Sequence, residues 1–315
     1  MRMDNMSTDI RNDVLMIHAG SKGSALNDDP QHFASMAPYT NKTLFTRILR
    51  EIWFRCKLPC AHIWYNKQIE SFEGKHLLVY DPQITREYLL WLQKHNKWTI
   101  HFYYGNKVGR ARHIRPDKIP AGIPVWTYDD RDSREYAMND CTKAGGNPRS
   151  FYEKQEPAYD VLYVGKDKGR GEFIFRLEQE LKNAGMKPFV RVVGDTRFQK
   201  KKDPRYGPGM PYDEICQLIA KSRAILNVAL PGQEGHTIRD TEAIWNNVKL
   251  ITTNAKTAER FYYRPENILV VDEKNVTVEQ IREFLDAPFI PYEPELQNCF
   301  LTSEWVREIV GESNS

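Results

Sequence analysis

The sequence predicts an α/β protein of two domains, and three observations support this. Its 315 residues suit about two domains of roughly 150 residues each. In the second half, short apolar runs that suit strands alternate with segments of helical periodicity, which is typical of a parallel, doubly wound sheet. Residues 144–159 are rich in glycine, proline and charge, which indicates a linker between the domains.

The first half contains the same two kinds of element. Apolar or β-branched runs predict strands at 14–17, 76–80, 98–104 and 124–128. Helical spacing of apolar residues predicts helices at 43–58 and 85–95. We expect Asp132 to be the N-cap of a further helix, although Asp130-Arg131-Asp132 also has the form of a metal-binding Asp-x-Asp motif.

The helix at 43–58 has two possible roles. Its apolar residues recur at helical spacing, beside four basic residues of the same segment. The helix could pack its apolar stripe on the sheet, or it could rest on an anionic membrane as a basic amphipathic helix. The sequence leaves both interpretations open.

In the second half, strands are expected at 160–164, 187–193, 224–229, 249–252 and 268–271. Helices are expected at 172–184, 211–222, 278–285 and 303–310. Because carboxyl ends of parallel strands lie at one edge of a sheet, the loops after the first and third of these strands should lie close together. That edge is where doubly wound sheets usually bind ligands.

Two loops at this edge suit a nucleotide sugar. The first carries Lys166, Lys168 and Arg170 among glycines, and we expect these cations to bind phosphate. The second leads into a helix start, whose N–H groups also favour phosphate. Arg239 and Glu242 are three residues apart and share one helix face, so the arginine could bind a phosphate while the carboxylate accepts sugar hydroxyls.

Composition excludes several other classes of protein. The net charge of +3 is too small to indicate a nucleic-acid partner, and the basic residues are scattered. No apolar run approaches the about 18 residues of a membrane span, and the polar first thirteen residues do not suit a secretory signal. The five cysteines are expected to be free thiols in a reducing cytosol, since no set of ligands completes a zinc site.

Over residues 124–271 the chain resembles bacterial glycosyltransferases of the GT-B fold, the group that assembles lipopolysaccharide, capsule or exopolysaccharide. The segments that carry the resemblance are YVGKDKGR (163–170), SRAILNV (222–228), GQEGHTIRDTEAIW (232–245) and KLITTN (249–254). The resemblance implies two Rossmann-like domains facing across a cleft, with an acceptor-side domain at 1–152 and a donor-binding domain at 153–292. It also implies that 293–315 supplies a helix that packs back on the first domain.

The resemblance assigns roles to individual residues of the second domain. Glu242 matches the glutamate that binds the ribose hydroxyls, and the first of the two glutamates in the family's Glu-x7-Glu spacing is Glu234. The other donor contacts that it implies are Lys166, Arg170, Gln233, Gly235, Thr237 and Arg239. Such enzymes need no metal and no cofactor besides the nucleotide-sugar substrate.

The catalytic residues are less determined. Glu234 is a candidate for contact with the donor sugar, whether the reaction retains or inverts the anomeric configuration. If the reaction inverts, a base from the first domain is required, and His18 or Asp28 could supply it.

These patterns predict a glycosyltransferase that moves a sugar from a nucleotide diphosphate donor, expected to be UDP-linked, to a bacterial surface glycan or a polyprenyl-linked acceptor. We expect a cytoplasmic protein, with peripheral contact to the inner membrane through 43–58, and the oligomeric state stays open. Two alternatives remain, a UDP-sugar epimerase or hydrolase on the same fold, and a non-catalytic glycan-binding relative.

Overall fold

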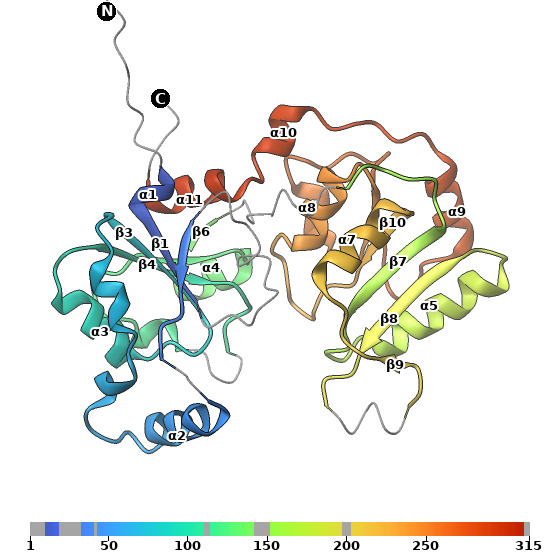
Figure 1. Ribbon diagram of the computed structural model, residues 1–315. Helices are drawn as coiled ribbons and strands as arrows, with labels where there is room; N and C mark the ends of the chain where they lie inside the picture. Colours follow the sequence, from blue (N-terminus) through green and yellow to red (C-terminus); the bar gives the residue numbers. More distant parts are fainter. Residues whose placement is uncertain are drawn as a thin grey trace, which may run out of the picture. The chain divides into compact units, whose positions relative to one another are not determined.

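The computed structural model describes residues 10–18, 33–40, 43–109, 114–141, 152–196 and 203–311. The chain divides into two compact units (Figure 1). The first contains residues 10–141 together with 306–311, and the second contains residues 152–305. Each unit is built on its own sheet.

In the first unit, all neighbouring strands of the sheet are parallel, in the order β2-β1-β3-β4-β5-β6. Its strands are β1 (Val14–Ile17), β2 (Ala34–Met36), β3 (His76–Tyr80), β4 (Thr99–Tyr104), β5 (Val125–Thr127) and β6 (Asn139–Asp140). Its helices are α1 (Ile10–Asp13), α2 (Leu44–Arg55), η1 (Ala61–Trp64), η2 (Lys67–Ser71), α3 (Arg86–Lys94), η3 (Pro116–Lys118) and α4 (Asp130–Tyr136). The order reverses between β1 and β3, so the topological switch point of this sheet lies there.

The sheet of the second unit is also parallel throughout, in the order β12-β11-β10-β7-β8-β9. Its strands are β7 (Tyr159–Lys166), β8 (Pro188–Val193), β9 (Tyr206–Gly207), β10 (Ser222–Asn227), β11 (Lys249–Thr252) and β12 (Ile268–Val270). Its helices are α5 (Gly171–Asn183), α7 (Tyr212–Ala220), α8 (Ile238–Trp245), η5 (Ala255–Glu259), α9 (Val278–Asp286) and α10 (Pro294–Asn298). Numbered from β7, this is the 3-2-1-4-5-6 order of a Rossmann fold, with the switch point between β7 and β10.

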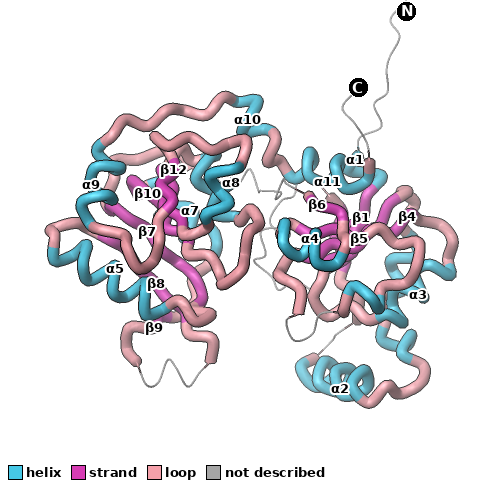
Figure 2. Tube along the Cα trace, turned by 180° about the vertical axis from the view of Figure 1, so that it is seen from behind, coloured by secondary structure: helices cyan, strands magenta, loops and turns pink. Residues whose placement is uncertain are grey.

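Helices cover both faces of the second sheet (Figure 2). One face packs against α5 and α9, through a cluster that includes Ile174 and Ile281. The other face packs against α7 and α8, through a cluster that includes Ile219 and Ile244. Strands buried on both faces read as continuous apolar runs, which explains why β7, β10 and β11 could be predicted from sequence.

The last helix, α11 (Thr302–Val310), begins in the second unit and ends in the first, where residues from Val306 onward belong. Trp305, Val306 and Ile309 are buried. The final helix predicted at 303–310 corresponds to α11, and its packing on the first domain stays a prediction. Most of the linker expected at 144–159 lies outside the described residues.

The predicted strands at 14–17, 76–80 and 249–252 have the bounds expected. Three short strands were missed, namely β2, β6 and β9. β6 and β9 have two residues each, and β2 and β9 are the outermost strands on their side of a sheet. Because they bury little apolar surface, they carry no period-2 pattern that a sequence could reveal.

One local prediction was wrong. Asp129 is the N-cap of α4, because its carboxylate accepts from the backbone N–H of Asp132 at 3.1 Å. Asp132 itself is buried and accepts from the N–H of Val108 at 2.7 Å, so it ties a loop to the helix.

The apolar stripe of α2 does not pack on the sheet, since it is exposed. None of the described helices is both long and apolar enough to cross a membrane.

Candidate functional site

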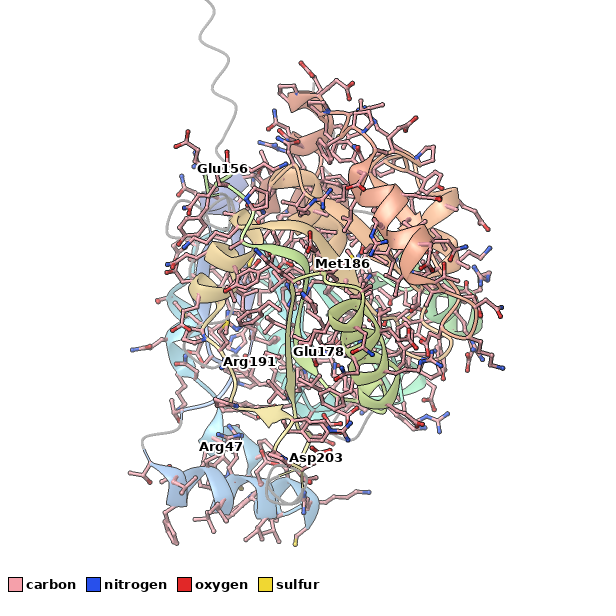
Figure 3. All side chains as sticks on the ribbon, turned by 90° about the vertical axis from the view of Figure 1, so that its right-hand side faces the viewer. Arg47, Glu156, Glu178, Met186, Arg191 and Asp203 are labelled. Atoms are coloured by element: carbon pink, nitrogen blue, oxygen red, sulfur yellow. The ribbon has the colours of Figure 1, made fainter. Side chains whose placement is uncertain are left out.

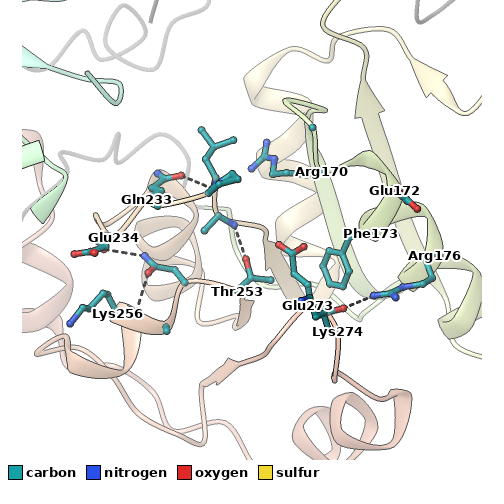
Figure 4. Close-up of a pocket in the computed structure, with 17 residues that line it drawn as sticks. Arg170, Glu172, Phe173, Arg176, Gln233, Glu234, Thr253, Lys256, Glu273 and Lys274 are labelled. Atoms are coloured by element: carbon teal, nitrogen blue, oxygen red, sulfur yellow. Dashed lines mark hydrogen bonds between the residues drawn. The ribbon is translucent and has the colours of Figure 1, made fainter. Parts of the chain in front are cut away.

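A cavity of about 800 Å³ lies at the carboxyl edge of the second sheet, beside the switch point (Figure 4). The loops that follow β7, β10, β11 and β12 all contribute to it. Residues from the first turns of α5 complete the wall. Its lining residues include Gly169, Arg170, Phe173, Arg176, Gln233, Glu234, Thr253, Asn254, Lys256, Glu273 and Lys274. The structure therefore brings together the two loops that the sequence placed at one edge.

The loop between β7 and α5 is shaped by its own carboxylate. Lys168 and Gly169 both have positive φ, 48° and 84°, which turns the chain sharply into α5. Asp167 accepts from the N–H of Gly171 at 2.7 Å and from the Tyr206 hydroxyl at 2.8 Å. Burial opposes its ionisation, but these bonds and backbone N–H donors hold the pKa of Asp167 below its usual value. A carboxylate thus already occupies the start of α5.

Arg170 joins the loop to the neighbouring strand. Its guanidinium donates to the carbonyl of Lys166 at 2.7 Å and to that of Asp167 at 3.1 Å. It also donates to the carbonyl of Val228, just beyond β10. Arginine has five N–H donors in a fixed plane, so these three bonds orient the positive charge at the switch point. Arg170, which was predicted to bind phosphate, therefore also holds the loop after β7 to the end of β10.

The second loop, after β10, is held by side chains from the loop after β11. Asn254 donates its amide to the carbonyls of Glu234 and Gly235, at 3.2 and 3.1 Å. Arg260 donates to the carbonyl of Glu234 at 2.8 Å. The Gln233 amide oxygen accepts from the N–H of Leu230 at 3.1 Å. These bonds fix the backbone from which Gln233 and Glu234 line the cavity.

The start of α8 is closed by a capping box. The Thr237 hydroxyl accepts from the N–H of Arg239, and the Asp240 carboxylate accepts from the N–H and hydroxyl of Thr237, at 3.0 and 2.6 Å. As at α5, the helix start carries a carboxylate of the protein itself. Positive charge for a phosphate must therefore come mainly from side chains rather than from the two helix dipoles.

Arg239 and Glu242 lie together but outside the residues that line the cavity. Their side chains form an ion pair, and Arg239 also donates to the carbonyl of Val164 at 3.0 Å. Glu242 is 1% exposed. Burial raises the pKa of its carboxyl, against the opposing effects of Arg239 and of the Tyr212 hydroxyl. Ribose binding by Glu242 remains a prediction, and it requires that this pair opens to a ligand.

The remaining predicted residues of the second unit have varied positions. Lys166 is the last residue of β7 and Lys168 lies on the loop after it. Both are exposed, and the backbone N–H of Lys168 donates to Asp195 at 2.7 Å. Gly235 is buried in the second loop, and Thr237 serves as the cap of α8. Neither of the two lines the cavity described above, unlike Arg170, Gln233 and Glu234.

Several lining residues were missed by the sequence analysis. Thr253, Asn254 and Lys256 follow β11, and Lys274 follows β12. Both strands had been predicted, so the same rule about carboxyl ends would have found these residues. Arg176 could not have been found in this way, because it reaches the cavity from the second turn of α5.

His18 lies at the corresponding switch point of the first unit, directly after β1. It is buried, and its ring lies 6.3 Å from that of Tyr80, at the end of β3. Burial lowers the pKa of His18, so the neutral, proton-accepting form predominates at neutral pH. Asp28, the other predicted base, lies outside the described residues.

Among the described residues, neither a metal-ligand cluster nor a disulfide is found. Within the described ranges, His, Cys, Asp and Glu side chains form no group of three or more that could hold an ion. All five cysteines are free thiols, with Cys56 and Cys60 exposed and Cys141 and Cys216 buried.

Comparison with known proteins gives a family match for part of the chain. Residues 172–289 match the model of a family described as glycosyl transferase-like. This segment extends from the first turn of α5 to just beyond α9 and contains most residues that line the cavity. No curated protein sequence matches the chain.

Solved structures are similar to the whole chain. AviGT4, a glycosyltransferase involved in avilamycin A biosynthesis, is 12% identical, with 95% of this chain and 98% of that chain covered and a TM-score of 0.51. The N-terminal domain of Candida albicans trehalose-6-phosphate phosphatase is 10% identical, with 96% and 97% covered and a TM-score of 0.51. The chain thus consists of two Rossmann-like α/β halves with parallel sheets, as in GT-B glycosyltransferases, and its segment 172–289 is glycosyltransferase-like.

Proposed function

We propose that this protein is a glycosyltransferase that takes a sugar from a nucleotide diphosphate donor bound at the cavity of the second unit. The observation that carries the proposal is the coincidence of two features. The glycosyl transferase-like match covers residues 172–289, and the cavity at the switch point is lined mostly by residues of that segment. Rossmann-like sheets bind nucleotides at this position.

The cavity offers charges that suit a diphosphate. Four basic side chains from four segments line it, namely Arg170, Arg176, Lys256 and Lys274. When the bond to the sugar breaks, negative charge develops on the diphosphate, and fixed cations stabilise that charge more than they stabilise the bound donor. Glu234 also lines the cavity, where its carboxylate can accept hydrogen bonds from hydroxyls of the transferred sugar.

The donor and acceptor are proposed from the resemblance. The donor is proposed to be UDP-linked, and the Glu-x7-Glu spacing of Glu234 and Glu242 matches that of retaining enzymes of this fold. The acceptor would be a bacterial surface glycan or a polyprenyl-linked saccharide, which would place the enzyme on the cytoplasmic side of the inner membrane. His18 would supply the base if the reaction inverts, since it is neutral at neutral pH.

Nucleotide binding tests the proposal first. We expect one class among UDP-, GDP- and CMP-sugars to raise the melting temperature, because a ligand that binds only the native state stabilises it. Glu234→Gln and Lys256→Ala should reduce this shift. Lys182→Ala, on the exposed face of α5, is a matched control that should leave it unchanged. No shift with any nucleotide sugar would contradict the proposal.

Product analysis separates the alternatives. A glycosyltransferase consumes its donor rapidly only when an acceptor is present. A UDP-sugar epimerase or hydrolase would convert the donor alone, and a non-catalytic glycan-binding protein would release no nucleotide with any acceptor pool.

A further inference from the structure

The helix α2 turns its apolar face away from its own unit. Leu44 and Phe45 are 74% and 72% exposed, and Ile48 and Ile52 are about half exposed. Ten large hydrophobic side chains are exposed in the described parts of the chain, and seven of them lie between Leu44 and Ile63. Scattered exposed apolar residues are normal, but a concentration of this kind marks an interaction surface.

On the opposite face of α2, one arginine side chain is buried against the first unit. Arg50 is 2% exposed, and its guanidinium lies 4.5 Å from the centroid of the Tyr39 ring. It donates to Glu51 at 3.0 Å and to Gln83 at 3.4 Å. A surface helix usually buries its apolar stripe and exposes its arginines. Here the apolar stripe is exposed and Arg50 is buried, and the cation–π contact and hydrogen bonds of Arg50 fix that orientation.

The exposed face is continuous and rigid. Residues 44, 45, 48, 49 and 52 follow helical spacing and form one stripe along a helix about 18 Å long. A capping box between Thr43 and Thr46 closes the start of the helix. The Trp53 indole donates to the carbonyl of Pro59 at 2.9 Å, which ties the following turn, with exposed Leu58, to the helix.

The charges beside the stripe are positive. Residues 43–63 contain four Arg or Lys and one acidic residue, Glu51, which is bonded to Arg50. The cations exposed along the stripe are Arg47, Arg55 and Lys57. A second copy of the chain docked on the same face would bring these cations against their counterparts, which is unfavourable. An anionic lipid surface satisfies both the apolar stripe and the cations at once.

We propose that residues 43–63 form a membrane-docking element, in which α2 lies flat in the headgroup region of an anionic bilayer. Its stripe would enter the acyl boundary, and Arg47, Arg55 and Lys57 would contact lipid phosphates (Figure 3 labels Arg47 on α2). The proposal does not depend on sugar transfer, although it would bring a lipid-linked acceptor to the enzyme.

Flotation of the full-length protein with vesicles tests this directly. We expect the protein to float with vesicles of equal parts phosphatidylcholine and phosphatidylglycerol. It should float weakly with phosphatidylcholine alone, and raised salt should weaken the binding to anionic vesicles. Equal binding to both kinds of vesicle, or binding to neither, would overturn the proposal.

Matched variants locate the surface. Ile48→Asp should lower partition onto anionic vesicles more than tenfold, because a carboxylate replaces a side chain that enters the acyl boundary. Ile290→Asp makes the same change at an exposed isoleucine of the second unit and should have no effect. Arg47→Gln should lower partition about fivefold, whereas Lys118→Gln, at an exposed lysine of the first unit, should not.

Two further measurements exclude other causes. Circular dichroism melting should be unchanged in Ile48→Asp, because the residue is exposed; if that variant melts early, Phe45→Ser tests the same stripe with a milder change. Sedimentation velocity without vesicles should show the same oligomeric state for wild type and Ile48→Asp. A wild-type dimer that Ile48→Asp dissociates, together with absent vesicle binding, would show that the stripe is an interface between copies instead.

Discussion

Arg239 forms an ion pair with the buried Glu242 within α8, and the same arginine donates to the carbonyl of Val164 in β7 at 3.0 Å. The pair thereby links the helix to the central strand of the second unit. Both residues were expected to bind the donor, yet in the folded chain they bond each other, and Oε1 of Glu242 is buried without a hydrogen-bond partner among the described residues. Their contribution to stability and their contribution to binding can be measured separately.

Glu242→Ala should lower the free energy of unfolding by about 3 kcal/mol, because it removes the carboxylate that balances the charge of the largely buried Arg239 side chain. The double variant Arg239→Met with Glu242→Leu should recover most of this loss, since it removes both charges. Denaturant titration of the three proteins measures the effect. If the double variant is as unstable as Glu242→Ala, the ion pair is not what the single change disrupts.

The double variant also tests the ribose assignment. Arg239 is itself a predicted donor contact, so the double variant is compared with Arg239→Met alone. If Glu242 binds the donor ribose, UDP affinity measured by calorimetry should fall further in the double variant than in Arg239→Met, even though stability has recovered. Unchanged affinity would restrict the role of Glu242 to the ion pair.

Arg170→Ala should slow sugar transfer by about 10²–10³-fold, the loss expected when one charged contact to the leaving group is removed. Arg170→Lys keeps the charge but cannot donate to the carbonyls of Lys166 and Val228 in one plane. We expect Lys at this position to restore only part of the rate. Steady-state rates for both variants provide the measurement, and full activity of Arg170→Ala would exclude the contact.

Asp167→Asn should destabilise the second unit by about 1 kcal/mol at neutral pH, because it weakens the hydrogen bonds that the carboxylate accepts from the N–H of Gly171 and the Tyr206 hydroxyl. The pKa of Asp167 is lowered in the folded chain, so its stabilising effect is present above the usual value of 3.8 and is lost as pH falls through the folded value. The variant should therefore lose less stability than wild type below about pH 4. Acid denaturation curves for the two proteins test this.

His236 should make the protein less stable in mild acid. It is buried, stacks on Phe300 and contacts the Tyr262 hydroxyl at 3.0 Å. Burial lowers its pKa to about 4, so the unfolded chain binds a proton more readily below the usual value of 6.5. Stability should fall by roughly 2 kcal/mol between about pH 6.5 and pH 5.

The control for this pH dependence is His236→Gln. Its free energy of unfolding should be lower than that of wild type at neutral pH but should change less between about pH 6.5 and pH 5. Some dependence should persist, because His101 also has a pKa lowered to about 4, by burial and by the neighbouring His76. An equal slope in the two proteins would contradict the assignment.

Much of the fold could be predicted because the buried strands are local apolar runs. β7, β10 and β11 lie in the middle of their sheet and are covered on both faces, so the central residues of each strand are apolar. From their alternation with helices, the parallel sheet and the edge that carries the cavity follow. The loops with Arg170 and Glu234 were placed at one edge by that rule alone.

Only the tertiary structure decided which of the predicted side chains line the cavity and which bond one another. The sequence showed that Arg239 and Glu242 share a helix face, but not that they bond each other in the interior. It showed that α2 is amphipathic, but the outward direction of its stripe depends on Tyr39 and Gln83, which receive Arg50 from distant segments. Periodicity shows on which face of a helix or strand a residue lies. The residue that it contacts is decided by packing between segments distant in sequence, which leaves no local pattern in the chain.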